Sequence, residues 1–129
     1  MYPSEYRYTR EHEWLDVKDD ICVLGITDFA QSELGEVVFV ELPEVGHLVD
    51  AGAEIGTIES VKAVAEVYTP VAGEIIEIND TLKDDPQSVN EDPHGDGWLL
   101  KLKVASGAEV GELLSAADYE KFVEEESKA

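Results

Sequence analysis

Short apolar runs separated by turn-forming residues recur along most of the chain. Such runs, in which apolar and polar residues tend to alternate, are typical of the strands of an all-β sandwich or barrel. Prolines and glycines between them provide the backbone angles that chain reversals need. The pattern predicts a mainly β fold with strands at Ile21–Ile26, Glu36–Glu41, Glu54–Ser60, Ala63–Tyr68, Gly73–Ile78 and Trp98–Val104.

Short helices are expected between some of these strands. Thr27 or Asp28 is suited to cap a helix that runs to Leu34, and Gly35 follows where a left-handed C-cap favours glycine. The segment Asn79–Gly97 is long for a structureless loop. We therefore expect helical turns or an ordered binding surface in it.

A further helix is expected near the C-terminus. Ser115 and Asp118 have the spacing of a capping box. Tyr119, Phe122 and Val123 follow as one apolar stripe. We expect this stripe to cover a sheet edge.

Length and charge limit the function classes. The chain has 129 residues, which suffices for one domain with a buried core, and we interpret residues 1–129 as a single domain. Nine Lys and Arg against thirty Asp and Glu give a net charge of −21, which excludes nucleic acids and anionic bilayers as partners. Apolar runs such as Val37–Val40 are far shorter than the roughly 20 residues of a membrane span, and Met1–Arg10 has no apolar signal-peptide core. We therefore expect a cytoplasmic location.

The cysteine and the histidines suggest no chemistry of their own. Cys22 is the single cysteine, so we expect a buried, inert thiol. His94 lies among acidic residues, but the acidic excess of the whole chain makes such a cluster ordinary, and we predict no metal site. We interpret His12 as a surface histidine on a packed strand, and Asn90–Pro93 as a loop that faces partners.

Lys62 stands between two predicted strands, at the expected tip of a hairpin. A lysine in a turn is most often an ordinary solvated charge, because loops face water. An enzyme that modifies only one lysine needs it to be presented distinctly, and a fixed turn provides this. The lysines from which such an enzyme would choose are Lys18, Lys62, Lys83, Lys101, Lys103, Lys121 and Lys128.

The sequence ESVKA around Lys62 resembles the lysine-bearing hairpin of lipoyl domains. The similarity extends to further motifs in the same order, over about residues 6–123. Together with ESVKA they resemble the H-protein family of the glycine cleavage system. These motifs are His12-Glu13-Trp14, GITDFAQSELGEVVFVELPEVG over Gly25–Gly46, TPVAGEIIEIN over Thr69–Asn79, and VNEDPHGDGWLLK over Val89–Lys101.

This resemblance implies a lipoyl-domain-type β-sandwich, a barrel-sandwich hybrid with short helices and a C-terminal helix. It implies a carrier rather than an enzyme, with lipoate joined to Lys62 through an amide. The aminomethyl group of glycine would be loaded by a glycine decarboxylase, the P protein. An aminomethyltransferase, the T protein, would pass it to tetrahydrofolate, and a dihydrolipoamide dehydrogenase, the L protein, would reoxidise the arm.

The resemblance also assigns individual residues. Glu59 and Gly46 match positions that lipoylating enzymes recognise, and Glu13 and Glu66 match acidic positions that contact the loaded arm. A carboxylate in a partly dry cleft can hold an ammonium group by a charge-assisted hydrogen bond, which gives these acidic residues a specific task.

Two alternatives stay open. Lys62 could form a Schiff base as an enzyme's nucleophile, which would require burial or a neighbouring cation to lower its pKa. Alternatively, a lipoylated chain could relay lipoate to other complexes. A biotin carrier is disfavoured, because methionines typically flank its lysine, whereas Val61 and Ala63 flank Lys62.

Overall fold

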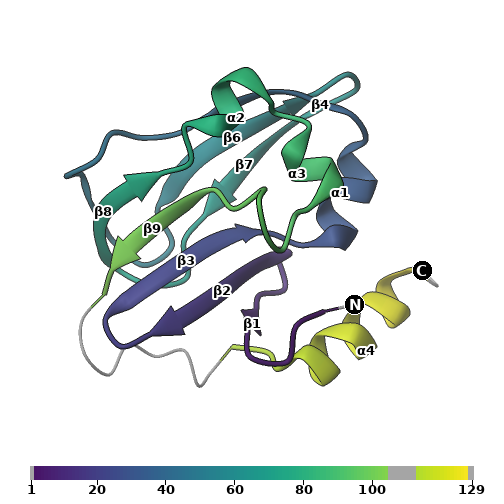
Figure 1. Cartoon of the computed structure of the whole chain (residues 1–129). Coiled ribbons are helices and arrows are strands. Elements are labelled where there is room, and N and C mark those ends of the chain that lie inside the picture. The colour runs from purple at the N-terminus through teal and green to yellow at the C-terminus, as the bar shows by residue number, and fades with distance from the viewer. Residues whose placement is uncertain (1, 105–112, 128–129) are drawn as a thin grey trace.

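The computed structural model describes residues 2–104 and 113–127 (Figure 1). In these two ranges no helix is both long and apolar enough to cross a membrane. The strands are β1 (Arg7–Tyr8), β2 (Glu13–Lys18), β3 (Ile21–Ile26), β4 (Val37–Glu41), β5 (Leu48–Val49), β6 (Glu54–Ser60), β7 (Val64–Tyr68), β8 (Gly73–Ile78) and β9 (Leu100–Lys103). The helices are α1 (Asp28–Leu34), α2 (Thr81–Asp84), α3 (Ser88–Glu91) and α4 (Ala116–Ser127).

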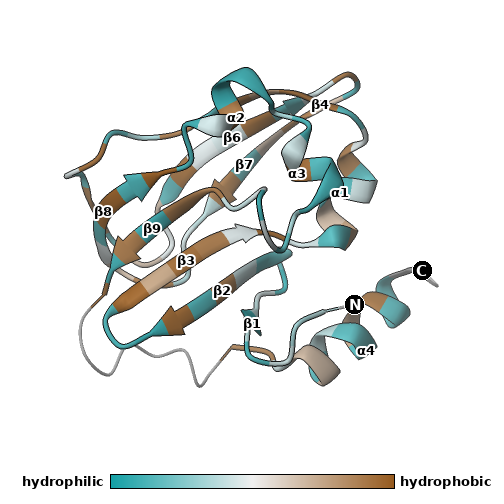
Figure 2. Ribbon diagram, in the orientation of Figure 1, coloured by the Kyte–Doolittle hydropathy of each residue, from teal (hydrophilic) through white to brown (hydrophobic). Residues whose placement is uncertain are grey.

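Two antiparallel sheets enclose the core. One has the strand order β1-β2-β3-β9-β8-β5, and the other has the order β4-β6-β7. Alternate residues of the strands contribute apolar side chains to one cluster that includes Leu24, Ile58 and Ile75, all buried. Figure 2 shows hydrophobic and hydrophilic residues alternating along several strands. The predicted mainly β sandwich with short helices and a C-terminal helix is confirmed.

The predicted strands are all present, and their bounds differ from the prediction by at most two residues at an end. Strands β1, β2 and β5 are not predicted. The first and the last have only two residues each, and in β2 the consecutive residues Glu13, Trp14 and Leu15 are all buried, which hides the alternation. Both α2 and α3 lie within Asn79–Gly97, which confirms the helical turns expected there.

The helix caps form as the sequence predicts. The Thr27 hydroxyl oxygen accepts a hydrogen bond from the Ala30 N–H at 3.2 Å at the start of α1. Gly35 follows the helix with a φ of 79°, a conformation that favours glycine. At the C-terminal helix, the Ser115 hydroxyl oxygen accepts from the Asp118 N–H at 3.2 Å.

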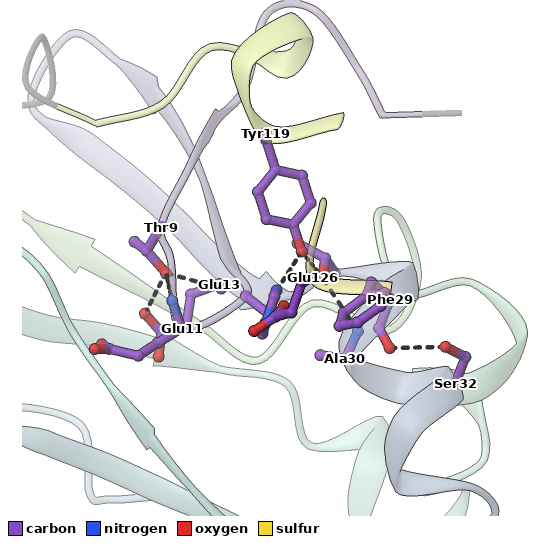
Figure 3. A network of polar contacts seen from close by, with 10 residues as sticks. Thr9, Glu11, Glu13, Phe29, Ala30, Ser32, Tyr119 and Glu126 are labelled. Carbon is purple, nitrogen blue, oxygen red and sulfur yellow. Dashed lines mark hydrogen bonds and ion pairs between the residues drawn. The ribbon is translucent and has the colours of Figure 1, made fainter. Parts of the chain in front are cut away.

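Helix α4 covers the edge strand β1, as predicted. The rings of Tyr119 and Tyr8 are both buried and stack with their centroids 4.9 Å apart. Tyr8 and Leu114 exchange two backbone hydrogen bonds of 2.9 and 2.8 Å. The Tyr119 hydroxyl lies 2.7 Å from Thr27 Oγ1 and 2.8 Å from His12 Nδ1 (Figure 3). It therefore joins the C-terminal helix to the cap of α1.

Replacement of this hydroxyl tests how strongly it holds the two helices. We expect Tyr119→Phe to lower the free energy of unfolding by about 2 kcal/mol, because the buried Thr27 loses a hydrogen-bond partner. Urea denaturation measures this change. The matched control is Tyr68→Phe, whose hydroxyl donates to Glu66 in an exposed pair, with an expected change within about 0.5 kcal/mol. Equal losses in the two variants would contradict the assignment.

Candidate functional site

Lys62 lies in the turn between β6 and β7, as predicted. The Ser60 hydroxyl oxygen accepts hydrogen bonds from the N–H groups of Lys62 at 3.3 Å and Ala63 at 3.0 Å. The Ser60 N–H also donates to the Ala63 carbonyl at 2.8 Å. The side chain of Ser60 thus fixes the turn by satisfying its backbone donors. Sequence reasoning misses this role, although serine is typical of such turns.

The Lys62 side chain is exposed, and its stem lies over the end of α1. Its Cε atom is 3.4 Å from the point where a Cβ atom on Gly35 would stand. The N–H of Val61 donates to the carbonyl of Glu36 at 3.0 Å, just before β4. The hairpin tip therefore rests on the connection between α1 and β4.

Asn90 of α3 holds this connection. Its Oδ1 atom accepts from the Val37 N–H at 2.8 Å, and its Nδ2 atom donates to the Gly35 carbonyl at 2.8 Å and to Gln31 Oε1 at 3.0 Å. The prediction that Asn90–Pro93 is a partner-facing loop is therefore wrong for Asn90, which is helical and points inward. The surrounding acidic residues suggest a solvated loop and carry no signal for the direction of one amide.

A cleft of about 580 Å³ is lined by α1, the edge strand β7 and residues of the turn before β2. Its lining combines apolar side chains with carboxylates, and His12 is its one group able to become a cation. The apolar lining residues are Ile26, Phe29, Ala30, Leu34, Ile58, Ala65 and Val67. The carboxylates are Glu11, Glu13, Glu33, Glu66 and Glu126. An apolar chain that ends in a cation fits such a cleft.

Glu13 is the buried carboxyl of this cleft, with 3% of the residue exposed. Its Oε1 atom accepts from the Thr9 hydroxyl at 2.9 Å (Figure 3). Its Oε2 atom accepts from the Tyr68 N–H at 3.3 Å on β7. Burial raises its pKa to about 7, although both hydrogen bonds act in the opposite direction. The charge of this carboxyl is therefore sensitive to any cation that enters the cleft.

His12 forms part of the rim of the cleft, next to Glu126. Its Nε2 atom lies 2.9 Å from Glu126 Oε2, and its ring lies against Phe29 with the centroids 4.7 Å apart. The residue stands in the turn before β2 with a φ of 69°, and only 17% of its side chain is exposed. The interpretation as a surface histidine on a strand is wrong, because the contact with Tyr119 draws the ring inward.

The structure brings two of the predicted site residues together. Glu13 and Glu66 line the same cleft, where Glu66 is exposed and accepts from the Tyr68 hydroxyl at 2.9 Å. Glu59 is exposed on β6, directly opposite Val64 and near the hairpin tip.

Gly46 lies apart from this group. Strand β4 pairs Val37 with Ser60 beside the hairpin and ends at Glu41, which pairs with Thr57 farther from the tip. Gly46 follows still farther along, in a turn where its φ is 96°. Its backbone conformation favours glycine for the turn itself.

Cys22 and His94 have contacts that serve the fold. Cys22 is fully buried, as predicted, and burial raises its pKa to about 12, which disfavours the reactive thiolate. His94 Nε2 accepts a hydrogen bond from the Asp28 N–H at 3.1 Å at the start of α1. In the described parts of the chain, no group of three or more His, Cys, Asp or Glu residues is placed to hold a metal ion.

The chain is similar to known proteins over nearly its whole length. The sequence model of the family described as "Glycine cleavage H-protein" matches residues 6–126. The glycine cleavage system H protein of Carboxydothermus hydrogenoformans is 50% identical over 128 residues, which cover 99% of this chain and 98% of that protein. That of Rubrobacter xylanophilus is 53% identical over 124 residues, with 96% of each chain covered.

A solved structure is similar over the whole fold. The crystal structure of a glycine cleavage system H protein from Mycobacterium marinum superposes with a TM-score of 0.85 at 38% identity. The match covers 98% of this chain and 99% of that chain. The motifs, the fold and these relatives together show that the chain belongs to the glycine cleavage H-protein family.

Proposed function

We propose that Lys62 carries lipoate in amide linkage and that the chain is the lipoyl carrier of the glycine cleavage system. The proposal depends on one observation above all, the fixed turn that presents Lys62 beside a cleft with apolar walls and acidic residues. The chain acts here as a carrier and not as an enzyme. Its partners are the P, T and L proteins and the enzymes that attach lipoate.

The cleft suits a lipoyl arm in shape and chemistry. The lysine stem lies over Gly35, and the next residue toward the start of α1, Leu34, already lines the cleft. Apolar side chains of α1, β6 and β7 then accept the aliphatic part of the arm. When bound, lipoate supplies the disulfide that takes up the aminomethyl group of glycine and gives it up again. Glu13 contacts the N–H of Tyr68, which is at the end of β7 away from Lys62.

Glu13 and Glu66 have the task of holding an ammonium group in the cleft. Glu13 accepts from Thr9 and from the Tyr68 N–H, and its carboxylate retains lone pairs for a further donor. A cation beside it favours the charged carboxylate and lowers the raised pKa again. The pair of opposite charges is strengthened where water is partly excluded.

The Schiff-base alternative lacks its physical requirement. Lys62 is exposed, and the other charged residues on the same hairpin near it, Glu59 and Glu66, are carboxylates and not cations. Neither burial nor a neighbouring cation is present among the described residues to activate the amine. The relay of lipoate to other complexes uses the same attachment site, and complementation of a strain without its own carrier distinguishes the two roles.

The proposal includes two recognition positions for lipoylating enzymes, Glu59 near the tip and Gly46 at the far end of the sheet. An enzyme that contacts both Glu59 and Gly46 must extend along β4. We further propose a single carrier domain and a cytoplasmic location, in keeping with the single cysteine and the net charge of −21.

We expect Lys62→Arg to abolish lipoylation and to leave the fold intact. A guanidinium does not form the amide, and an exposed side chain at a hairpin tip contributes little to packing. Intact mass after incubation with a purified lipoate–protein ligase, lipoate and ATP measures the modification. Lys83→Arg, another exposed lysine, is the control and should gain the full lipoyl mass. Modification of Lys62→Arg at another lysine would remove the assignment.

We expect Glu59→Ala to slow lipoate attachment more than it lowers thermal stability. Glu59 is exposed beside the turn, where an enzyme can contact it and where the core does not depend on it. The rate of mass increase under limiting ligase, together with the melting temperature, separates the two effects. Glu54→Ala at the exposed start of the same strand is the matched control. Equal lipoylation rates for both variants and the parent would reduce Glu59 to a surface charge.

The raised pKa of Glu13 predicts a pH dependence of stability. The folded state binds this proton up to about pH 7, whereas the unfolded chain releases it near pH 4.5. The contribution of protonated Glu13 to the free energy of unfolding is fully present below pH 4.5. It is lost as pH rises through 7, which lowers the free energy of unfolding by about 3 kcal/mol. Unfolding free energies at pH 4.5 to 8 should therefore fall more steeply in the parent than in Glu13→Gln. The exposed Glu66→Gln should keep the parent slope, and a parent slope in Glu13→Gln would refute the assignment.

The two carboxylates should also protect the loaded carrier. We expect the double variant Glu13→Gln, Glu66→Gln to be lipoylated to completion and to be reoxidised like the parent. Without T protein, however, it should release ammonia and formaldehyde faster once loaded, because neither Glu13 nor Glu66 then holds the ammonium. Glu41→Gln, an exposed carboxylate on β4, controls for the change in net charge. An unchanged release rate in the double variant would show that Glu13 and Glu66 do not hold the ammonium group.

A further inference from the structure

Exposed apolar side chains gather around the hairpin of Lys62. In the described parts of the chain, six large hydrophobic residues are exposed, and four of them lie on this hairpin or on the adjoining strand β4. They are Val38, Phe39, Val61 and Val64, with exposed fractions of 41%, 52%, 67% and 63%. We call these four residues the hairpin patch. Exposed apolar side chains that adjoin one another mark interaction surfaces.

The strand register explains why the patch is continuous. Phe39 pairs with Glu59, and Glu59 pairs with Val64, so these three side chains form one row across β4, β6 and β7. The register shift between Val37 and Phe39 leaves Val38 exposed beside this row. Val61 adds an apolar side chain in the turn itself. Val64, at one end of the row, is two residues after Lys62 in the sequence.

The charges around the patch are of one sign. The next row across the sheet contains Glu41 and Glu66 at its two ends, and Glu36 precedes β4. In residues 36–41 and 54–68, Lys62 is the one basic residue among several carboxylates. A complementary protein surface therefore has an apolar centre and a rim of Arg or Lys.

The chemistry at Lys62 indicates which partner must cover this surface. In the acylation, the neutral Nζ attacks the carbonyl carbon of an activated lipoyl donor, an acyl adenylate. The C–N amide bond forms, the bond to the phosphate oxygen breaks, AMP leaves, and the amine proton passes to a base or to water. The acylating enzyme must bring its active site to Nζ itself, whereas enzymes that act at the distal end of the arm need only reach that end.

We propose that the hairpin patch is the docking surface of the enzyme that acylates Lys62, and that this enzyme offers an apolar pocket with a basic rim. The inference rests on the proposed function and adds residues to its recognition site. One side of the Lys62 stem lies against Gly35, so the enzyme approaches from the outer face of the hairpin, where Phe39 and Val64 flank Glu59. Phe39, as the aromatic residue of the patch, is its main anchor.

The test compares exposed apolar residues on and off the patch. Full-length Phe39→Ser, Val64→Ser and Ala117→Ser are acylated by a purified lipoate–protein ligase with lipoate and ATP, and intact mass gives the rates. We expect Phe39→Ser to raise the KM for the carrier about tenfold and to leave kcat within about twofold. Val64→Ser should act in the same direction, and Phe39→Leu should recover most of the affinity. Ala117 is exposed on α4, away from the hairpin and from Gly46, so Ala117→Ser should behave like the parent.

Salt tests the basic rim of the enzyme. The KM of the parent should rise with ionic strength, and Glu41→Gln should weaken that dependence, because one carboxylate beside the patch is removed. Melting temperatures close to the parent value exclude unfolding as the cause of a raised KM.

The outcomes separate this inference from the proposed function. A parent-like KM in both Phe39→Ser and Val64→Ser, with the parent fully acylated, overturns the docking surface and leaves the carrier role intact. An effect of Phe39→Ser on loading by the glycine decarboxylase alone also overturns it, since the patch would then serve another partner. Failure of the parent to be acylated at Lys62 removes the proposed function and this inference with it.

Discussion

The position of α1 depends on hydrogen bonds at its two ends. The helix has seven residues, too few to be stable on its own, and none is fully buried, although Ala30 and Leu34 pack against the core. At its start, Thr27 caps it and contacts the Tyr119 hydroxyl. At its end, Asn90 bonds the carbonyl of Gly35. Because α1 lines the cleft and supports the Lys62 stem, these few polar contacts determine the geometry of the whole site.

The acidic cleft is costly to the folded chain in the absence of a cation. Burial of Glu13 disfavours its charged form, and the nearby carboxylates of Glu11 and Glu66 add no compensating positive charge. The hydrogen bonds from Thr9 and from the Tyr68 N–H orient the carboxyl without neutralising it. The second of these also satisfies a donor on the edge strand β7. One residue thus satisfies a donor at a sheet edge and carries the acceptor proposed for a bound ammonium.

Much of the fold follows from local patterns, and the missing parts have physical causes. The strands with regular alternation, the cap at Thr27 and the glycine at position 35 are all predictable, because each depends on neighbouring residues. Strand β2 is not predicted, because both of its faces are buried. Trp14 lies in the aromatic cluster with Tyr119 of α4, and Leu15 lies in the core. That burial depends on a helix about a hundred residues away in the sequence.

The candidate site divides in the same way. Lys62, Glu59, Glu13 and Glu66 come from motifs, whereas the contacts that position them join distant segments. Asn90 reaches a connection more than fifty residues earlier, and the Tyr119 hydroxyl reaches His12 across more than a hundred. The direction of one amide or one hydroxyl is set only when these segments meet, so the sequence alone carries no signal for it.

The hairpin separates two tasks through the alternation of its side chains. Ile58 and Ala65 form one pair that faces the cleft, and the next pair along, Glu59 and Val64, faces outward. A slip of one residue in this register would exchange the two faces and place Glu59 against the apolar lining of the cleft. The turn fixed by Ser60 prevents this slip, because its hydrogen bonds leave only Val61 and Lys62 outside the ladder. The same short turn therefore sets both the surface proposed for the acylating enzyme and the wall proposed for the attached arm.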